Sequence, residues 1–283
     1  MLRLGAHTFG FLWQASAEAA FAAIAEAGFT QIQLMAATPH FAPWREDRAR
    51  TQRLRRILER NGMSLLALDL PSSEINLASP SPEVVSFAVN AYALTVARCA
   101  ELGAKWVSVG SGRQHGLLSG ADPKLLEMFH AAFVHIAEEA RRHGVGVILE
   151  NHPQGLLCDA ASIDRFLARE SREDVRVTYD VANAFAIGEN PVEGLRRLAP
   201  RLGVVHVSDS PIGQWRHDPV GSGAIDFAAI GACLAEQGFE GPIALEVLSG
   251  RPLDDMVEGA HRLAAMGWTF ADPLPTRLAS KRH

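Results

Sequence analysis

The feature that most constrains the fold of this chain is a repeating alternation of short apolar runs and longer amphipathic stretches. Short apolar runs between turn residues predict buried strands, whereas apolar residues at every third or fourth position predict helices. Eight strands are predicted at 3–7, 31–35, 64–69, 106–110, 146–150, 176–180, 204–208 and 243–247. Eight helices are predicted between and after them, at 16–27, 49–61, 82–102, 123–143, 161–169, 191–199, 226–237 and 253–266.

Strands that alternate with helices pair in parallel and are covered by the helices on their faces. Eight parallel strands in a chain of 283 residues most simply close into a (β/α)8 TIM barrel. An open doubly wound sheet is the alternative, and the lack of a GxGxxG motif after the first strand weakens its dinucleotide-binding form. We find no linker or composition break, so we expect residues 1–283 to form one domain, with about 270–283 as a C-terminal tail.

Charge and cysteine content narrow the classes of partner and compartment. The formal net charge is −5, from 27 Lys and Arg against 32 Asp and Glu, so no basic surplus favours nucleic acid or anionic membrane. The three cysteines, Cys99, Cys158 and Cys233, lack the spacing of a disulfide framework or zinc site. No signal-peptide pattern or long apolar segment stands out. We therefore expect a cytoplasmic protein that binds neither nucleic acid nor membrane, and a homo-oligomer is left open.

Polar residues end four consecutive predicted strands. Glu150, Asp180, His206 and Glu246 fall at or near the ends of strands five to eight, where a barrel carries its functional side chains. A single acidic residue there is more often a helix cap or an ion-pair partner. Four such residues on neighbouring strands instead indicate one divalent metal site. Three carboxylates and one imidazole favour Mn²⁺, Mg²⁺ or Co²⁺, with Zn²⁺ as a further candidate.

Five segments carry a family resemblance: GVILENH, VTYDVANA, VVHVSDS, PVGSGAIDF (219–227) and IALEV. Together they resemble the xylose isomerase-like TIM barrel family of sugar isomerases and epimerases. The resemblance implies that Glu150, Asp180, His206 and Glu246 bind the metal ion. It also implies that Glu150 and Glu246 act as the catalytic acid and base.

The implied reaction is removal of the proton beside a carbonyl, through a metal-stabilised enediolate. Returning a proton to the same carbon from the other face gives an epimer, and returning it to the adjacent carbon gives an isomer. The expected substrate is a small keto-sugar, sugar acid or sugar phosphate. The alternative is a lyase of the same fold, of the inosose or 3-dehydroshikimate dehydratase type. An apurinic-site endonuclease would need more metal ligands and a cationic groove, and a non-catalytic barrel would not need the four ligands.

Five further residues are candidates for substrate binding. Asn183 stands three residues after Asp180, where many family members have histidine. Arg216 and His217 follow the seventh strand, His152 follows the fifth and His7 ends the first. Each of these side chains has an alternative structural role, in a solvated loop or in packing. Three aromatic residues could add apolar walls for a sugar ring or pack on other loops: Trp13, Phe41 and Trp44.

Overall fold

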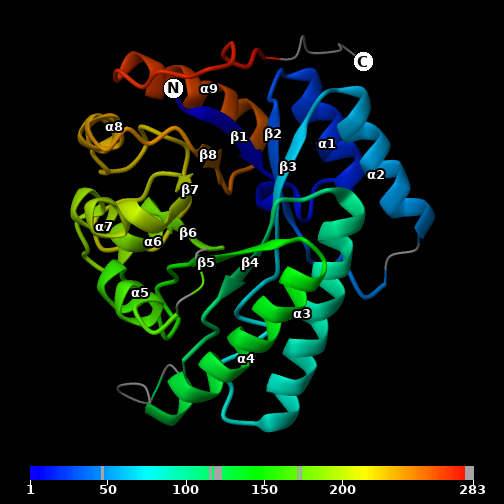
Figure 1. Ribbon diagram of the computed structural model, residues 1–283. Helices are drawn as coiled ribbons and strands as arrows, with labels where there is room; N and C mark the ends of the chain where they lie inside the picture. Colours follow the sequence, from blue (N-terminus) through cyan, green and yellow to red (C-terminus); the bar gives the residue numbers. More distant parts are fainter. Residues whose placement is uncertain (46–47, 115–116, 118–122, 171, 173, 278–283) are drawn as a thin grey trace.

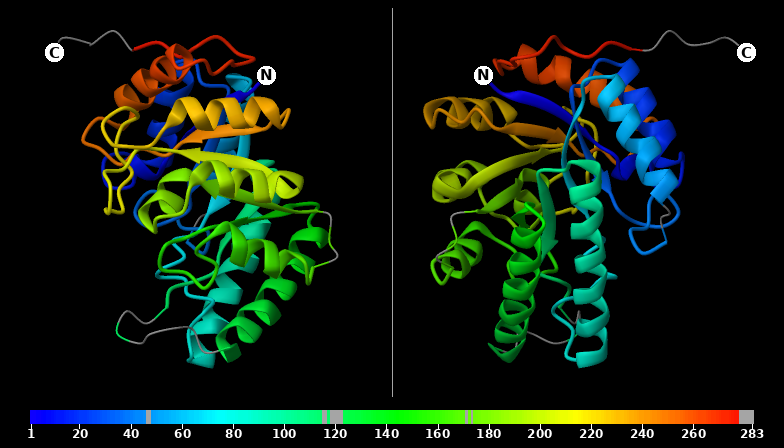
Figure 2. Two further views of the ribbon diagram at one scale, coloured as in Figure 1. Left: turned by 90° about the vertical axis from the view of Figure 1, so that its left-hand side faces the viewer. Right: turned by 45° about the vertical axis from the view of Figure 1, so that its right-hand side comes forward.

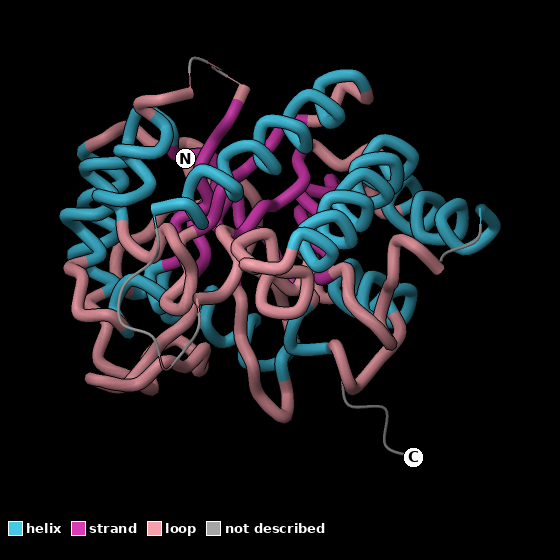
Figure 3. Tube along the Cα trace, turned by 90° about the horizontal axis from the view of Figure 1, so that it is seen from below, coloured by secondary structure: helices cyan, strands magenta, loops and turns pink. Residues whose placement is uncertain are grey.

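The computed structural model describes residues 1–45, 48–114, 117, 123–170, 172 and 174–277. Its centre is a closed barrel of eight parallel strands in sequential order, as Figures 1 and 3 show. The strands are β1 (Arg3–His7), β2 (Gln31–Met35), β3 (Ser64–Asp69), β4 (Trp106–Gly110), β5 (Gly146–Glu150), β6 (Val175–Asp180), β7 (Leu202–Val207) and β8 (Pro242–Leu245). Because β1 also pairs with β8, the open doubly wound sheet is excluded and the TIM barrel is confirmed.

Helices surround the barrel (Figure 3), and the two longest, α3 and α4, lie side by side (Figure 2). The α-helices are α1 (Ala17–Glu26), α2 (Arg48–Arg60), α3 (Pro82–Leu102), α4 (Pro123–Arg142), α5 (Ala160–Leu167), α6 (Val181–Ala186), α7 (Pro191–Leu198), α8 (Phe227–Glu236) and α9 (Pro252–Ala265). Two 3-10 helices are η1 (Phe9–Phe11) and η2 (Ala199–Arg201). The predicted helices are all present, and α6, η1 and η2 are additions that no sequence pattern indicated.

The strand bounds differ from prediction mainly in the second half of the barrel. The seventh strand begins two residues earlier and ends at Val207, and the eighth ends at Leu245 rather than at 247. Glu246 was therefore wrongly placed inside a strand, since it is the first residue after β8. Its backbone N–H still donates to the carbonyl of Val207, at 3.1 Å, so the residue remains held against β7.

Alternation along the strands separates two apolar layers. Leu149, Val205 and Leu245 belong to the large core between barrel and helices. The residues just before them, Ile148, Val204 and Ala244, form a smaller cluster of their own. Because every second side chain of a strand points to the same face, the positions two residues further on face the barrel interior at its C-terminal end. Those positions are Glu150, His206 and Glu246.

The end of the described chain packs on the helices beside the N-terminus. Leu2 forms a β-bridge with Phe270, and the N–H of Thr276 donates to the carbonyl of Ala27 at 2.8 Å. The predicted tail at about 270–283 is thus ordered against the barrel as far as residue 277, and 278–283 lie outside the described residues. Within the described ranges, no helix combines the length and apolar character needed to cross a membrane.

Candidate functional site

The structure brings the four predicted metal ligands together at the C-terminal mouth of the barrel. Glu150 ends β5, Asp180 ends β6, His206 lies in β7 and Glu246 follows β8. One potential ligand atom from each lies within 4.8 Å of the others. The Nδ1 atom of His206 lies 3.2 Å from Glu150 Oε1 and 3.0 Å from Glu246 Oε2.

Asp180 is fixed by its neighbours on both sides. Its Oδ1 accepts a hydrogen bond from the N–H of Asn183 at 2.7 Å and caps α6. The side chain of Asn151 bridges its backbone, accepting from the N–H of Asp180 at 2.8 Å and donating to its carbonyl at 3.0 Å. This arrangement holds the second carboxylate oxygen, Oδ2, toward His206, at 3.9 Å from Nδ1.

The donor atoms of this cluster fit a divalent cation. Asp180 Oδ2 is buried and has no hydrogen-bond partner among the described residues. Buried carboxylate oxygens are rarely left without a partner, because their loss of hydration is unfavourable. Three carboxylates and one imidazole offer the hard, mostly oxygen ligands that Mg²⁺ and Mn²⁺ prefer. The cluster is therefore consistent with a divalent metal site.

The crowding of these groups away from water changes their pKa values. Burial raises the pKa of Glu150 and raises that of Asp180 to about 7. Burial lowers the pKa of His206, but the nearby charges of Glu246 and Glu150 outweigh it and raise that pKa well above its ordinary value. The carboxylates of the cluster thus stabilise a positive charge placed between them, as expected of a cation-binding site.

Above the cluster lies a cavity of about 590 Å³. Glu150 and Glu246 line it, whereas Asp180 and His206 are not among its lining residues. Two of the three predicted aromatic walls, Trp13 and Trp44, also line it, but Phe41 is fully buried and does not. The other predicted substrate-binding residues all line this cavity: His7, His152, Asn183, Arg216 and His217.

Several of those side chains are already engaged with protein groups. Asn183 donates from Nδ2 to the carbonyl of Asn151 at 3.0 Å and accepts from Trp215 Nε1 at 2.7 Å. Arg216 donates from Nε and Nη2 to Asp218, at 3.0 and 2.8 Å. Asn183 and Arg216 therefore form part of the cavity wall together with these partners. Part of the hydrogen-bonding capacity of each side chain is already used within the protein, so only the rest is left for a substrate.

His217 and His152, which both line the cavity, have different surroundings. His217 Nδ1 lies 3.0 Å from Ser208 Oγ and 3.8 Å from both Asp180 Oδ2 and Glu246 Oε2. His152 packs edge-on against Trp215, with ring centroids 4.9 Å apart. Burial, together with the charge of His217, lowers the pKa of His152 to about 4. At neutral pH His152 is consequently a neutral hydrogen-bonding group.

Two buried aspartates near the site were missed by sequence reasoning. Asp69 ends β3 and lines the cavity, and a polar residue closing the apolar run SLLALD was a signal that could have found it. Asp209 follows β7 and accepts hydrogen bonds from the N–H groups of Ser210, Gly221, Gly223 and Ile225. No local pattern indicates that role, because its partners lie up to 16 residues away.

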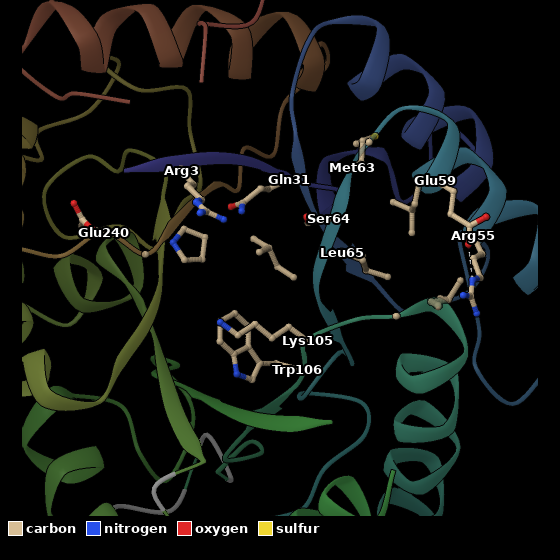
Figure 4. A pocket seen from close by; sticks show the side chains of 17 residues that line it. Arg3, Gln31, Arg55, Glu59, Met63, Ser64, Leu65, Lys105, Trp106 and Glu240 are labelled. Carbon is tan, nitrogen blue, oxygen red and sulfur yellow. Dashed lines mark hydrogen bonds and ion pairs between the residues drawn. The ribbon is translucent and has the colours of Figure 1, made fainter. Parts of the chain in front are cut away.

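A second, larger cavity of about 720 Å³ opens at the opposite, N-terminal mouth of the barrel (Figure 4). Its lining includes Arg3, Gln31, Ser64 and Lys105, and the ammonium of Lys105 lies 3.9 Å from the ring centroid of Trp106. Within the described ranges, the one cluster with metal-ligand geometry is at the other mouth. Barrel enzymes carry their chemistry at the C-terminal mouth, so the smaller cavity is the candidate active site.

Comparison with known proteins gives a family and several relatives. The model of the xylose isomerase-like TIM barrel family matches residues 21–266. An L-ribulose 3-epimerase from Mesorhizobium japonicum is 26% identical over 264 residues, 90% of this chain and 84% of the relative. An uncharacterized protein from Methanocaldococcus jannaschii is 26% identical and an inosose dehydratase from Geobacillus kaustophilus is 29% identical. Those matches cover 64% and 56% of this chain, and the chain spans 64% and 55% of the two relatives.

Solved structures match the whole barrel. A D-tagatose 3-epimerase-like protein superposes with a TM-score of 0.82 at 22% identity, covering 94% of this chain and 97% of the other. A D-allulose 3-epimerase from Methylomonas sp., solved in complex with D-allulose, gives a TM-score of 0.74 at 20% identity, covering 88% and 85%. At these identities the structural matches show the fold alone.

Proposed function

The chain belongs to the xylose isomerase-like TIM barrel family, and from this premise we propose that it is a metal-dependent isomerase or epimerase of a small keto-sugar. The observation that carries the proposal is the placement of two carboxylates. Glu150 and Glu246 each place a carboxylate oxygen within 3.2 Å of His206 Nδ1, and both line the cavity above the cluster. The L-ribulose 3-epimerase relative, matched over most of its length, supports epimerisation.

The proposed reaction begins with removal of the proton beside the substrate carbonyl. A divalent ion held by Glu150, Asp180, His206 and Glu246 would polarise that carbonyl and stabilise the negative charge that develops. One glutamate takes the proton from one face of the carbon, and the other returns a proton to the opposite face, so the carbon is inverted. Asp180 and His206 do not line the cavity, so the role proposed for them is to bind the ion.

The charges around the cavity favour a substrate without a phosphate or carboxylate. Among the described lining residues, Arg216 is the one arginine or lysine, and Asp218 already binds its guanidinium. Asp69 and Glu74 add negative charge to the same lining. Of the substrate classes expected from the sequence, an uncharged keto-sugar is therefore favoured over a sugar acid or sugar phosphate.

Replacement of either glutamate tests the catalytic roles. We expect Glu150→Gln and Glu246→Gln to lower turnover by about 100-fold or more, since general acid–base groups contribute on that order. The assay is a screen of ketoses with added Mn²⁺, Mg²⁺ or Co²⁺, followed by NMR of the products in D₂O. Incorporation of solvent deuterium at one carbon would identify the proton that is removed.

A matched control is Glu59→Gln, because Glu59 is an exposed glutamate that lines the cavity at the opposite mouth. It should keep wild-type turnover. Retention of substantial activity by both Glu150→Gln and Glu246→Gln, on a ketose that the wild type converts, would rule out the proposed acid–base pair.

A dehydratase of the same fold is the second candidate, because the inosose dehydratase relative is 29% identical over 182 residues. The first step would be the same, but the intermediate would expel a neighbouring hydroxyl instead of regaining a proton. The two reactions differ in their products. Conjugated ultraviolet absorption that grows with turnover would favour the dehydratase, whereas an epimer adds none.

A further inference from the structure

Asp69 presents a buried carboxylate oxygen that the protein leaves unpaired. The residue is 4% exposed. His7 Nε2 lies 2.6 Å from its Oδ2, and Gln33 Nε2 donates to the same oxygen at 2.7 Å. The other oxygen, Oδ1, is buried without a hydrogen-bond partner in the described part of the chain. An unpaired buried carboxylate oxygen is unfavourable, so a partner from outside the protein is expected.

The position of Asp69 places its carboxylate in the wall of the substrate cavity. Asp69 is the last residue of β3 and lines the cavity together with His7, Glu150 and Glu246. It is not one of the clustered metal ligands. One imidazole ring separates it from Glu246, because His7 Nε2 contacts Asp69 while His7 Nδ1 lies 3.8 Å from Glu246 Oε1.

His7 is held in one orientation by both of its nitrogens. The backbone N–H of Phe9 donates to Nδ1 at 3.0 Å, so Nδ1 is an acceptor and Nε2 carries the proton that is donated to Asp69. Asp69 Oδ2 is therefore committed to His7 and Gln33. The free Oδ1 can accept a hydrogen bond but cannot donate one, and a hydroxyl is the donor that a keto-sugar provides.

We propose that Asp69 is a specificity-determining residue, whose Oδ1 accepts a hydrogen bond from a substrate hydroxyl. This inference rests on the proposed function and narrows its substrate class to polyhydroxylated ketoses with an uncharged chain. A phosphate or carboxylate in place of that hydroxyl would face the carboxylate of Asp69 in the cavity wall, and like charges would repel.

The first experiment compares wild type and Asp69→Asn on D-tagatose and its monodeoxy analogues. The amide can keep an oxygen toward His7 and Gln33 while replacing Oδ1 by a donor, so the variant changes mainly the free position. We expect KM for D-tagatose to rise by about tenfold or more, with a much smaller change in kcat. The monodeoxy analogue that lacks the hydroxyl bound by Asp69 should bind the wild type about tenfold more weakly than D-tagatose does. The same analogue should bind wild type and Asp69→Asn with equal affinity.

Asp164→Asn is the control, because Asp164 is an exposed aspartate of α5 paired with Arg197. It should leave KM and kcat unchanged. The deoxy comparison on wild-type protein needs no variant, so it can overturn the inference even if Asp69→Asn does not fold. Unchanged KM in folded Asp69→Asn, or equal binding of all analogues by the wild type, would overturn the inference.

The second experiment compares D-tagatose with D-tagatose 6-phosphate by calorimetry on the wild type and on Asp69→Asn. We expect the phosphate to bind more weakly, and Asp69→Asn to reduce that difference. Equal or tighter binding of the phosphate would contradict the inference. If the sugars bind in this Asp69-dependent way but the wild type converts none of them, the inference stands and the proposed function fails.

Discussion

The loop between β7 and α8 is organised by a single buried carboxylate. Asp209 is 1% exposed and accepts four backbone N–H groups, from Ser210, Gly221, Gly223 and Ile225, at 2.8 to 3.2 Å. A Cβ added to Gly223 would lie 2.3 Å from Asp209 Oδ1, so only glycine fits there. The segment PVGSGAIDF therefore wraps the backbone around Asp209, and the same loop presents Trp215, Arg216 and His217 to the cavity.

We predict that Asp209→Asn destabilises the protein, since an amide nitrogen would face N–H donors instead of accepting from them. Hydrogen bonds to a charged acceptor contribute about 1.5 to 3 kcal/mol each, so the free energy of unfolding should fall by about 3 kcal/mol. Urea unfolding followed by circular dichroism measures this as a lower midpoint. The control is Asp226→Asn in the same loop, because asparagine also caps helices well. Equal midpoints for wild type and Asp209→Asn would show that the carboxylate does not organise the loop.

At the scale of elements, local patterns predicted most of the fold. The bounds of β1 to β5 and of α3 match the prediction, and most of these ends fall at or next to a polar residue, glycine or proline. The C-terminal end of β2 is an exception, because Met35 is followed by Ala36. Helix α6 was missed because its six residues, VANAFA, are too few and too apolar to show a helical period. It forms because Asp180, fixed by Asn151 on the neighbouring strand end, caps its first turn. That cause is a tertiary contact, which no local window of sequence contains.

Helix α5 begins with a reciprocal cap whose contribution depends on pH. Asp159 accepts from the N–H of Ser162 at 2.7 Å, and Ser162 Oγ accepts from the N–H of Asp159 at 3.2 Å. Burial raises the pKa of Asp159, but the hydrogen bonds from Ser162 outweigh it and hold that pKa below the ordinary value of 3.8. A lowered pKa in the folded state means that the charged form adds stability above the unfolded value, and that this stability is lost as pH falls further.

We predict that Asp159→Ala lowers the free energy of unfolding by about 1 kcal/mol at pH 7. The difference from wild type should narrow as the pH falls below about 4, because the wild-type carboxylate is then protonated. Asp159→Asn is the matched variant, since it keeps the cap without a titrating charge and should differ little from wild type at low pH. Urea midpoints measured from pH 3 to pH 7 would show the trend. A difference that widens toward pH 3 would contradict the assigned role of the charge.

At the scale of the whole molecule, the barrel explains which site residues the sequence could predict. Parallel strands end at one mouth, so polar residues closing successive strands must converge, as Glu150, Asp180 and His206 do. Pairing between loops follows no such rule. The bonds from Arg216 to Asp218 and from Trp215 to Asn183 depend on how the β7–α8 loop folds back over the mouth. Sequence patterns identified several residues of the cavity wall but not which of their atoms remain for a substrate.

The cluster also predicts how a metal ion should affect the stability of the entire barrel. Its four candidate ligands come from β5, β6, β7 and the end of β8, so an ion bound there would join half of the barrel and would have no equivalent site in the unfolded chain. An ion at 100 times its Kd would add about 2.7 kcal/mol to the free energy of unfolding. We therefore expect Mn²⁺, added after EDTA treatment, to raise Tm by several degrees.

Glu246→Gln should lose most of this shift, whereas Glu59→Gln, at the opposite mouth, should keep it. An equal rise in Tm for Glu246→Gln and wild type would place the bound ion elsewhere, because a true ligand cannot be replaced without weakening the site.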